Sequence, residues 1–159
     1  MTREAEVRLA VAGGGFGATN HWHEHPAFEV TAVADITEER RQRLMHEYAC
    51  ERAFPSLAAM LDEAAATFDA VAIFTDPPHH AAHAIACMEA GKHVVSACPV
   101  GLTLDECRQV RDAKERTGLK YMLHESSYYR QPCIAAREAY EAGEFGRIAY
   151  SELEYYHPG

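Results

Sequence analysis

The sequence predicts an α/β fold of the doubly wound type, a parallel sheet with helices on both faces. Two features predict it: short apolar segments alternate with longer amphipathic ones, and a glycine-rich turn directly follows the first apolar segment. The short segments are apolar along their whole length, which is typical of strands that are covered on both faces. The expected strands are residues 7–12, 30–34, 70–74, 93–96 and 120–123.

Each expected helix between these strands is bounded by a capping residue or by a residue that stops helices. Thr and Ser hydroxyls cap helix starts, Pro suits a first turn, and Gly favours a helix end. The predicted helices are residues 38–48 after Thr37, a shorter helix after Ser56, one from Pro78 to Gly91, and one from the Thr103–Glu106 capping box to about Gly118.

Composition excludes several classes of protein. With 48% hydrophobic and 25% charged residues among 159, the chain suits one folded domain with an appendage. A net charge of −9 repels nucleic acid and anionic lipid, so neither is expected as a partner. The five cysteines include no C-x-x-C pair, which disfavours disulfides and zinc knuckles. Without a signal peptide or a long apolar run, we expect a cytoplasmic protein.

The first strand runs directly into Gly13-Gly14-Gly15-Phe16-Gly17-Ala18, a G-x-G-x-x-A motif that we expect to lie between a strand and a helix. In such a motif Gly13 permits a tight turn, Gly15 lets the backbone approach a pyrophosphate, and Ala18 lets helix and strand pack closely. Free N–H groups at the start of the helix would face the anion. The motif predicts a dinucleotide site, although such a turn can also be a simple tight connection.

Asp35 ends the second strand, at the spacing of roughly 20 residues after Gly13 where an acid accepts hydrogen bonds from the adenine ribose. Ile36 follows, and no adjacent basic residue compensates for the charge of the acid. A carboxylate there repels a 2′-phosphate, so we expect NAD rather than NADP. The alternative for Asp35 alone is a carboxylate that caps the next helix.

Two further stretches identify a family. They are Phe68-Asp69-Ala70-Val71-Ala72-Ile73-Phe74-Thr75-Asp76-Pro77-Pro78-His79-His80 and Ala90-Gly91-Lys92-His93-Val94-Val95-Ser96-Ala97-Cys98-Pro99. With the glycine turn, they resemble the Gfo/Idh/MocA oxidoreductase family. The resemblance implies a Rossmann domain over residues 1–125 and the start of a truncated substrate and oligomerisation domain over residues 126–159, with NAD(P) between them and a sugar, polyol or related alcohol as substrate.

The resemblance also implies which residues contact the cofactor. Those that match the family are Gly13, Gly15, Phe16, Gly17 and Ala18 in the phosphate turn, Asp35 at the ribose, and Thr75, Pro77 and His80 in the loop after the fourth strand. His21 matches a histidine often found in the first helix, where we expect a structural role.

One departure concerns catalysis. The family's Glu-Lys-Pro appears as Ala97-Cys98-Pro99, so its carboxylate and its proton-transferring lysine are both replaced. Cys98 is the one candidate for a catalytic residue, with a buried inert thiol as the alternative. The expected function is that of an NAD-dependent oxidoreductase transferring hydride, and the alternative is a non-catalytic NAD-binding or sensory module.

The segment after residue 131 has a different character. Residues 132–141 predict a helix that ends at Gly143, and residues 148–156 predict an aromatic strand with no later strand to pair with. Such a strand either pairs with another chain or begins a sheet whose remainder is absent. It is the basis for expecting a homo-oligomer.

Two histidine-rich stretches, His21-Trp22-His23-Glu24-His25 and His79-His80-x-x-His83, suggest a metal-binding alternative. At helical spacing, residues 21, 23 and 25 point in different directions, and no cysteine cluster accompanies them. We therefore expect no metal site.

Overall fold

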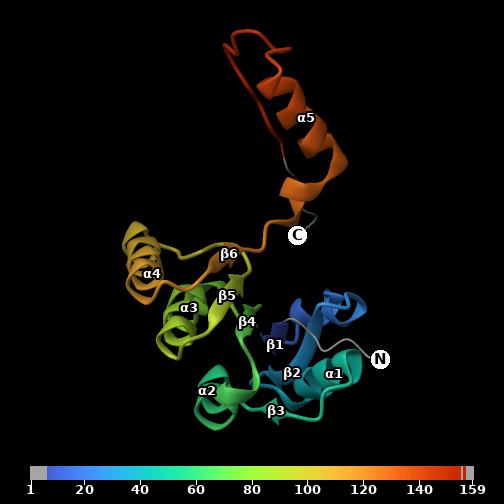
Figure 1. Ribbon diagram of the computed structural model, residues 1–159, viewed down its shortest axis with the longest axis vertical. Helices are drawn as coiled ribbons and strands as arrows, with labels where there is room; N and C mark the ends of the chain where they lie inside the picture. The colour runs from blue at the N-terminus through green and yellow to red at the C-terminus, as the bar shows by residue number, and fades with distance from the viewer. Residues whose placement is uncertain (1–6, 155, 157–159) are drawn as a thin grey trace. The chain divides into compact units, whose positions relative to one another are not determined.

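A six-stranded parallel sheet organises the computed structural model, which describes residues 7–154 and 156 (Figure 1). The strands lie in the order β3-β2-β1-β4-β5-β6, so the chain winds outward in both directions from the neighbouring pair β1 and β4. The strands are β1 (Val7–Ala12), β2 (Phe28–Ala34), β3 (Ala53–Phe54), β4 (Ala70–Ile73), β5 (His93–Ser96) and β6 (Tyr121–Leu123). In a sheet of this order, ligands bind beyond the carboxyl ends of the strands where the winding reverses.

Two of the predicted side-chain caps form, at Ser56 and Thr103, whereas the Thr37 hydroxyl makes no cap hydrogen bond to the helix after it and donates to the Asp35 carboxylate instead. Ser56 Oγ accepts a hydrogen bond from the Ala59 N–H, and Thr103 and Glu106 form a reciprocal capping box. The α-helices are α1 (Glu38–Tyr48), α2 (Leu57–Ala64), α3 (His80–Glu89), α4 (Leu104–Thr117) and α5 (Gln131–Glu141). Single 3₁₀ turns are η1 (Gly17–Thr19), η2 (Trp22–Glu24), η3 (Ala65–Thr67), η4 (Pro77–His79) and η5 (Ser126–Tyr129).

Side chains of β1 point alternately into two buried cores. Ala10 and Ala12 pack on one face of the sheet, in the core that contains apolar residues of α2, α3 and α4. Leu9 and Val11 pack on the other face, with Leu44 of α1. This alternation with period two places helices on both faces, as predicted.

The five strands predicted between residues 7 and 123 are confirmed, and β3 is an addition. It pairs two residues with β2, from Val33 opposite Ala53 to Ala34 opposite Phe54. A strand of two residues is too short to show a hydrophobic period, so only the backbone pairing reveals it.

The helix expected after the glycine turn is wrong. Residues 13–27 form the turn and two separate 3₁₀ turns, η1 and η2, with Asn20 extended between them. The backbone is extended at Asn20 and non-helical at His21, so η1 does not continue into η2 as one helix, and Pro26 follows shortly before β2. His21 is therefore not in a first helix but in the linker before η2, where it is exposed.

The strand expected over residues 148–156 is also wrong for the residues that the structure describes. Residues 148–154 and 156 are irregular and exposed, and Tyr155 lies outside the described residues. A strand is stabilised by pairing with a neighbour, and no other described segment pairs with this one. Self-association through residues 148–156 stays a prediction, because the described residues of this segment form no strand.

The chain divides into two compact units, Met1–His124 and Glu125–Gly159. The first contains the sheet. In the second, α5 packs against η5: Arg137 donates a hydrogen bond to the Tyr128 carbonyl oxygen at 2.7 Å, and its guanidinium lies 3.8 Å from the centre of the Tyr128 ring. Among the described residues, no helix combines the length and apolar character needed to cross a bilayer.

We predict that an ion pair between the starts of β1 and β4 contributes to stability in an acid-sensitive way. Arg8 donates to both carboxylate oxygens of Asp69, at 2.6 Å and 3.0 Å, and this holds the Asp69 pKa at about 2, below its ordinary 3.8. A lowered folded-state pKa means that the contribution is complete above the unfolded pKa and is lost as pH falls through about 2.

Urea unfolding of the Asp69→Asn variant checks this prediction. The variant should be less stable than the wild type near neutral pH, and the difference should shrink steadily as the pH is lowered from about 4 toward 2. A difference that stays constant over that range would contradict the assignment.

Candidate functional site

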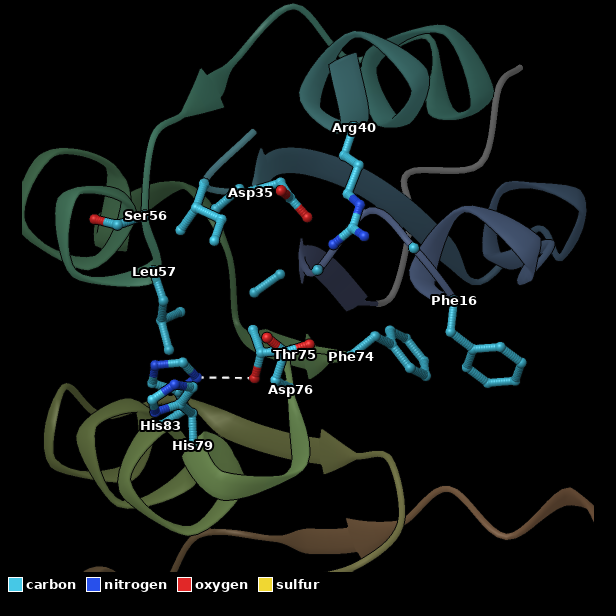
Figure 2. A pocket seen from close by; sticks show the side chains of 15 residues that line it. Phe16, Asp35, Arg40, Ser56, Leu57, Phe74, Thr75, Asp76, His79 and His83 are labelled. Atoms are coloured by element: carbon cyan, nitrogen blue, oxygen red, sulfur yellow. Dashed lines mark hydrogen bonds between the residues drawn. The ribbon is translucent and has the colours of Figure 1, made fainter. Parts of the chain in front are cut away.

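A cavity of about 440 Å³ opens at the carboxyl ends of β1, β2 and β4 (Figure 2). It lies where the winding of the sheet reverses, the place that the strand order predicts for a ligand. Its lining is formed by Ala12, Gly13, Gly15, Phe16, Ala34, Asp35, Ile36, Arg40, Ser56, Leu57, Phe74, Thr75, Asp76, His79 and His83.

Gly13 is required by the protein itself. Its φ of +102° is one that side chains rarely adopt, and an added Cβ would lie 2.2 Å from the Phe74 carbonyl oxygen. Its N–H donates to the Ala34 carbonyl oxygen at 2.8 Å. The turn is thereby pressed between the ends of β2 and β4, which only a glycine permits.

Gly15 is not required by the protein, and this is the most informative feature of the cavity. An added Cβ would meet no atom within 4 Å, and its φ lies outside the left-handed range. Its side of the turn faces the cavity. The N–H groups of Gly15 and Phe16 have no hydrogen-bond acceptor among the described residues. A side-chain-free backbone with two available donors fits a phosphate group that approaches closely.

Asp35 ties the glycine turn to the start of α1. Its carboxylate accepts hydrogen bonds from the Gly14 N–H at 2.6 Å and from the N–H and hydroxyl of Thr37, both at 2.8 Å. Burial alone would raise the Asp35 pKa, but the hydrogen bonds from Thr37 and Gly14 outweigh it and the pKa lies below its ordinary value. The ionised group has about four acceptor positions, so roughly one remains for a ligand hydroxyl.

Arg40 is a site residue that the sequence reasoning missed. It lies in the first turn of α1, and its guanidinium points into the cavity on the side of Asp35 (Figure 2). Arg41 pairs with Glu38, but the Arg40 guanidinium forms no hydrogen bond or ion pair with another described residue. Its charge contributes to the lowered pKa of Asp35. Arg40 lies shortly after Asp35, in the first turn of the helix that begins beside the site, and this proximity in sequence is the signal that could have predicted its role.

The opposite wall is formed by the loop after β4 and by α3. Thr75 Oγ1 shares a hydrogen bond of 2.9 Å with His83 Nδ1, and the His79 and His83 rings stack at 5.5 Å. Burial lowers the His83 pKa, and the neighbouring His79 and His80 lower it further. An uncharged imidazole at neutral pH and the aliphatic Leu57 give this wall a flat, weakly polar surface, of the kind that a nucleobase can contact.

The residues predicted for the cofactor divide into two groups. Some line the cavity, and the others lie outside its lining and pack against the residues that form it. The lining residues are Gly13, Gly15, Phe16, Asp35 and Thr75, and the residues outside the lining are Gly17, Ala18, Pro77 and His80. Gly17 and Ala18 are buried beneath the turn.

His80 has a supporting position and does not face the cavity. It is 1% exposed, with Nδ1 at 2.8 Å from the Pro99 carbonyl oxygen and Nε2 at 2.7 Å from the Thr75 carbonyl oxygen. It therefore holds the loop after β4 to the segment after β5.

Cys98 is exposed, so the alternative of a buried inert thiol is wrong. Its Sγ lies 3.9 Å from the His124 carbonyl oxygen, a weak contact that leaves the side chain at the surface. Neither Ala97 nor Cys98 supplies the acid or the strong cationic donor that the resemblance leads one to expect there.

A parallel sheet of this order with a glycine cradle and an ionised acid at its reversal point defines a dinucleotide-binding Rossmann domain. Comparison with known proteins gives the family. The profile described as "Oxidoreductase family, NAD-binding Rossmann fold" matches residues 7–125. The chain belongs to this family, Gfo/Idh/MocA.

Several known proteins are similar to the chain. The D-apiose dehydrogenase of Paraburkholderia graminis is 31% identical over 149 residues, covering 92% of this chain and 39% of that protein. Glycosyl hydrolase family 109 protein 1 of Bacteroides thetaiotaomicron is 30% identical, and the match covers 95% of this chain and 34% of that protein. The WlbA dehydrogenase of Bordetella pertussis, solved with NADH and UDP-GlcNAcA, superimposes with a TM-score of 0.84 at 26% identity. The superposition covers 91% of this chain and 42% of that protein. The chain thus spans less than half the length of each.

We predict that Gly15→Ala impairs cofactor binding without loss of stability. The added methyl meets no protein atom but enters the space beside the two available N–H groups, so the NADH dissociation constant should rise at least about tenfold, which corresponds to ~1.4 kcal/mol. Thermal unfolding and NADH fluorescence titration measure the two effects.

Gly14→Ala is the matched control, because its Cβ would lie 2.7 Å from the Arg40 carbonyl oxygen. This variant should unfold at a lower temperature. Normal NADH affinity in Gly15→Ala would refute the assignment of the cradle.

Proposed function

We propose that the chain is the NAD-binding part of an oxidoreductase that transfers hydride between a nicotinamide cofactor and a sugar, polyol or related alcohol. The observation that carries the proposal is the Gly15 cradle, where the backbone of the turn faces the cavity with two available N–H groups. Membership of the oxidoreductase family supports it. The similarity to a D-apiose dehydrogenase supports a carbohydrate as substrate.

In this proposal, the residues of the chain bind and orient the cofactor. The Gly15 and Phe16 N–H groups hold the pyrophosphate, Asp35 accepts a hydrogen bond from an adenine-ribose hydroxyl, and the His79–His83 wall contacts the base. NAD(H), when bound, supplies the site that accepts or donates hydride. Proton transfer to the substrate falls to groups other than the Ala97-Cys98 pair, because neither is a strong acid or base near neutral pH.

NAD is the preferred cofactor in this proposal, and Arg40 reduces the preference for NAD over NADP. The Asp35 carboxylate repels a 2′-phosphate, whereas the Arg40 guanidinium on the same side of the cavity attracts one. Compensation for the acid thus comes from α1 rather than from the residue after Asp35. We expect NADP to bind more weakly than NAD but to remain measurable.

A second candidate function is a non-catalytic NAD-binding or sensory module. The observation that favours it is the Ala97-Cys98 pair, a partly buried alanine and an exposed cysteine, which stands where the family resemblance implies an acid and a lysine. Both candidates require cofactor binding, so they differ only in turnover. A longer polypeptide that includes the remaining substrate domain should reduce NAD with a carbohydrate alcohol if the first proposal holds, and should bind NAD without turnover if the second does.

Titration of the 159-residue chain with NADH, followed by nicotinamide fluorescence, tests the binding on which both candidates rest. Saturable binding is expected, with competition by NAD. Absence of binding at millimolar NADH would contradict both proposals.

Opposite charge changes in the cavity should alter cofactor choice in opposite directions. Arg40→Gln removes the cation and should weaken NADP by about tenfold while changing NAD little, because charge-assisted hydrogen bonds contribute ~1.5–3 kcal/mol. Asp35→Asn removes the anion and should reduce the difference in affinity between NAD and NADP. Competition titrations with both dinucleotides measure the ratios, and Arg43→Gln, on the exposed face of α1, serves as the control. Equal effects of Arg40→Gln on both dinucleotides would contradict its proposed role.

A further inference from the structure

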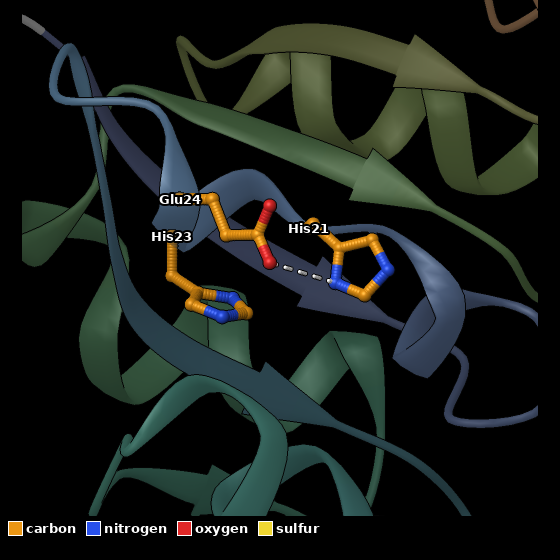
Figure 3. Close-up of side chains that lie close together, drawn as sticks. All are labelled: His21, His23 and Glu24. Atoms are coloured by element: carbon orange, nitrogen blue, oxygen red, sulfur yellow. Dashed lines mark ion pairs between the residues drawn. The ribbon is translucent and has the colours of Figure 1, made fainter.

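The 3₁₀ segment that replaces the expected helix brings metal-ligating side chains together. A ring nitrogen of His21, a ring nitrogen of His23 and a carboxylate oxygen of Glu24 all lie within 4.8 Å of one another (Figure 3). The expectation that residues 21, 23 and 25 would point in different directions assumed α-helical spacing, and His25 is not part of this cluster. His21 precedes η2 with a non-helical backbone (φ −95°, ψ 51°), and Glu24, three residues later, lies beside it.

A fourth candidate donor comes from a different element; it lies close to His21 but outside the group of three whose donor atoms are all within 4.8 Å of one another. Glu47, near the end of α1, has its Oε1 3.7 Å from His21 Nδ1, and Glu24 Oε1 lies 3.6 Å from the same nitrogen. Zinc binds histidine nitrogen and carboxylate oxygen at about 2.0–2.2 Å, so two donors of a tetrahedral site lie roughly 3.4 Å apart. Both distances match this separation to within a few tenths of an ångström.

The two segments that supply these donors are already held together. Tyr48, next to Glu47, has its hydroxyl 2.6 Å from the carbonyl oxygens of both Gly17 and Asn20. Its ring also packs edge-on against the His23 ring, with 5.5 Å between centres. An ion at this place would therefore need adjustment of side chains rather than of the backbone, which lowers the ordering cost of binding.

We propose that His21, His23, Glu24 and Glu47 bind a divalent transition-metal ion of the zinc class, outside the dinucleotide cavity. Two neutral imidazoles and two carboxylates carry a charge that balances a dication, and nitrogen and oxygen donors suit zinc. The ion links α1 to the segment after the glycine turn, and that segment contains 3₁₀ turns in place of the expected helix. The site is independent of the proposed function, because none of its residues lines the cavity.

Calorimetric titration of the 159-residue chain with Zn²⁺, near neutral pH in a buffer that does not chelate metals, tests the proposal. One ion should bind per chain with a dissociation constant in the micromolar range. His23→Ala and Glu47→Gln should each weaken binding at least tenfold. Substitution with Co²⁺ should give the intense visible absorption of a four-coordinate ion, and the thermal unfolding temperature should rise with added Zn²⁺.

His46→Ala is the matched control, because His46 is an exposed histidine on the same helix, next to Glu47, and outside the donor set. It should bind Zn²⁺ as the wild type does. Far-UV circular dichroism establishes that each variant is folded before its affinity is compared. No binding below millimolar Zn²⁺, unchanged affinity in both ligand variants, or an equal loss in His46→Ala would each overturn the proposal, and the cluster would then be a network of histidine–glutamate ion pairs.

Discussion

The close approach of the glycine turn to the ends of β2 and β4 is the constraint on which the rest of the site depends. Gly13 lies against the Phe74 carbonyl, where no side chain fits, and Asp35 fastens Gly14 to the start of α1. With both sides of the turn fixed, Gly15 is held at the cavity with its backbone uncovered. The donors for an anion are thus arranged before any ligand arrives, which reduces the cost of binding.

The electrostatics of the cavity oppose those of the whole chain. The protein carries a net charge of −9, yet the site combines two backbone N–H groups that have no acceptor in the described part of the chain with the guanidinium of Arg40. Asp35 and Asp76 are the acids in the lining of the cavity, and three donors from the chain already bind the Asp35 carboxylate. In the proposed binding mode a dinucleotide has the backbone donors along its phosphates and Asp35 at its ribose, so the position of each group matters more than the net charge of the chain.

Features encoded by neighbouring residues could be predicted from the sequence. The start of α1 after Thr37 and the capping box at Thr103 depend on contacts within one helical turn, and both helices begin as expected. Gly13 and Asp35 were found because the spacing of a phosphate-binding motif is local to one β-α-β unit. Arg40 and His83 were not found, because α1 and α3 bring them to the cavity only when the sheet has assembled.

Two predictions are wrong for different physical reasons. The helix after the turn was inferred from the motif, but the extended backbone at Asn20 separates η1 from η2. The strand over residues 148–156 was inferred from composition, but a strand also needs a partner. The most direct test of the central claim is the ¹H–¹⁵N spectrum of the chain during titration with NAD. The Gly15 and Phe16 amide signals should shift most and saturate together; if they stay fixed while signals elsewhere move, the phosphates bind at another place.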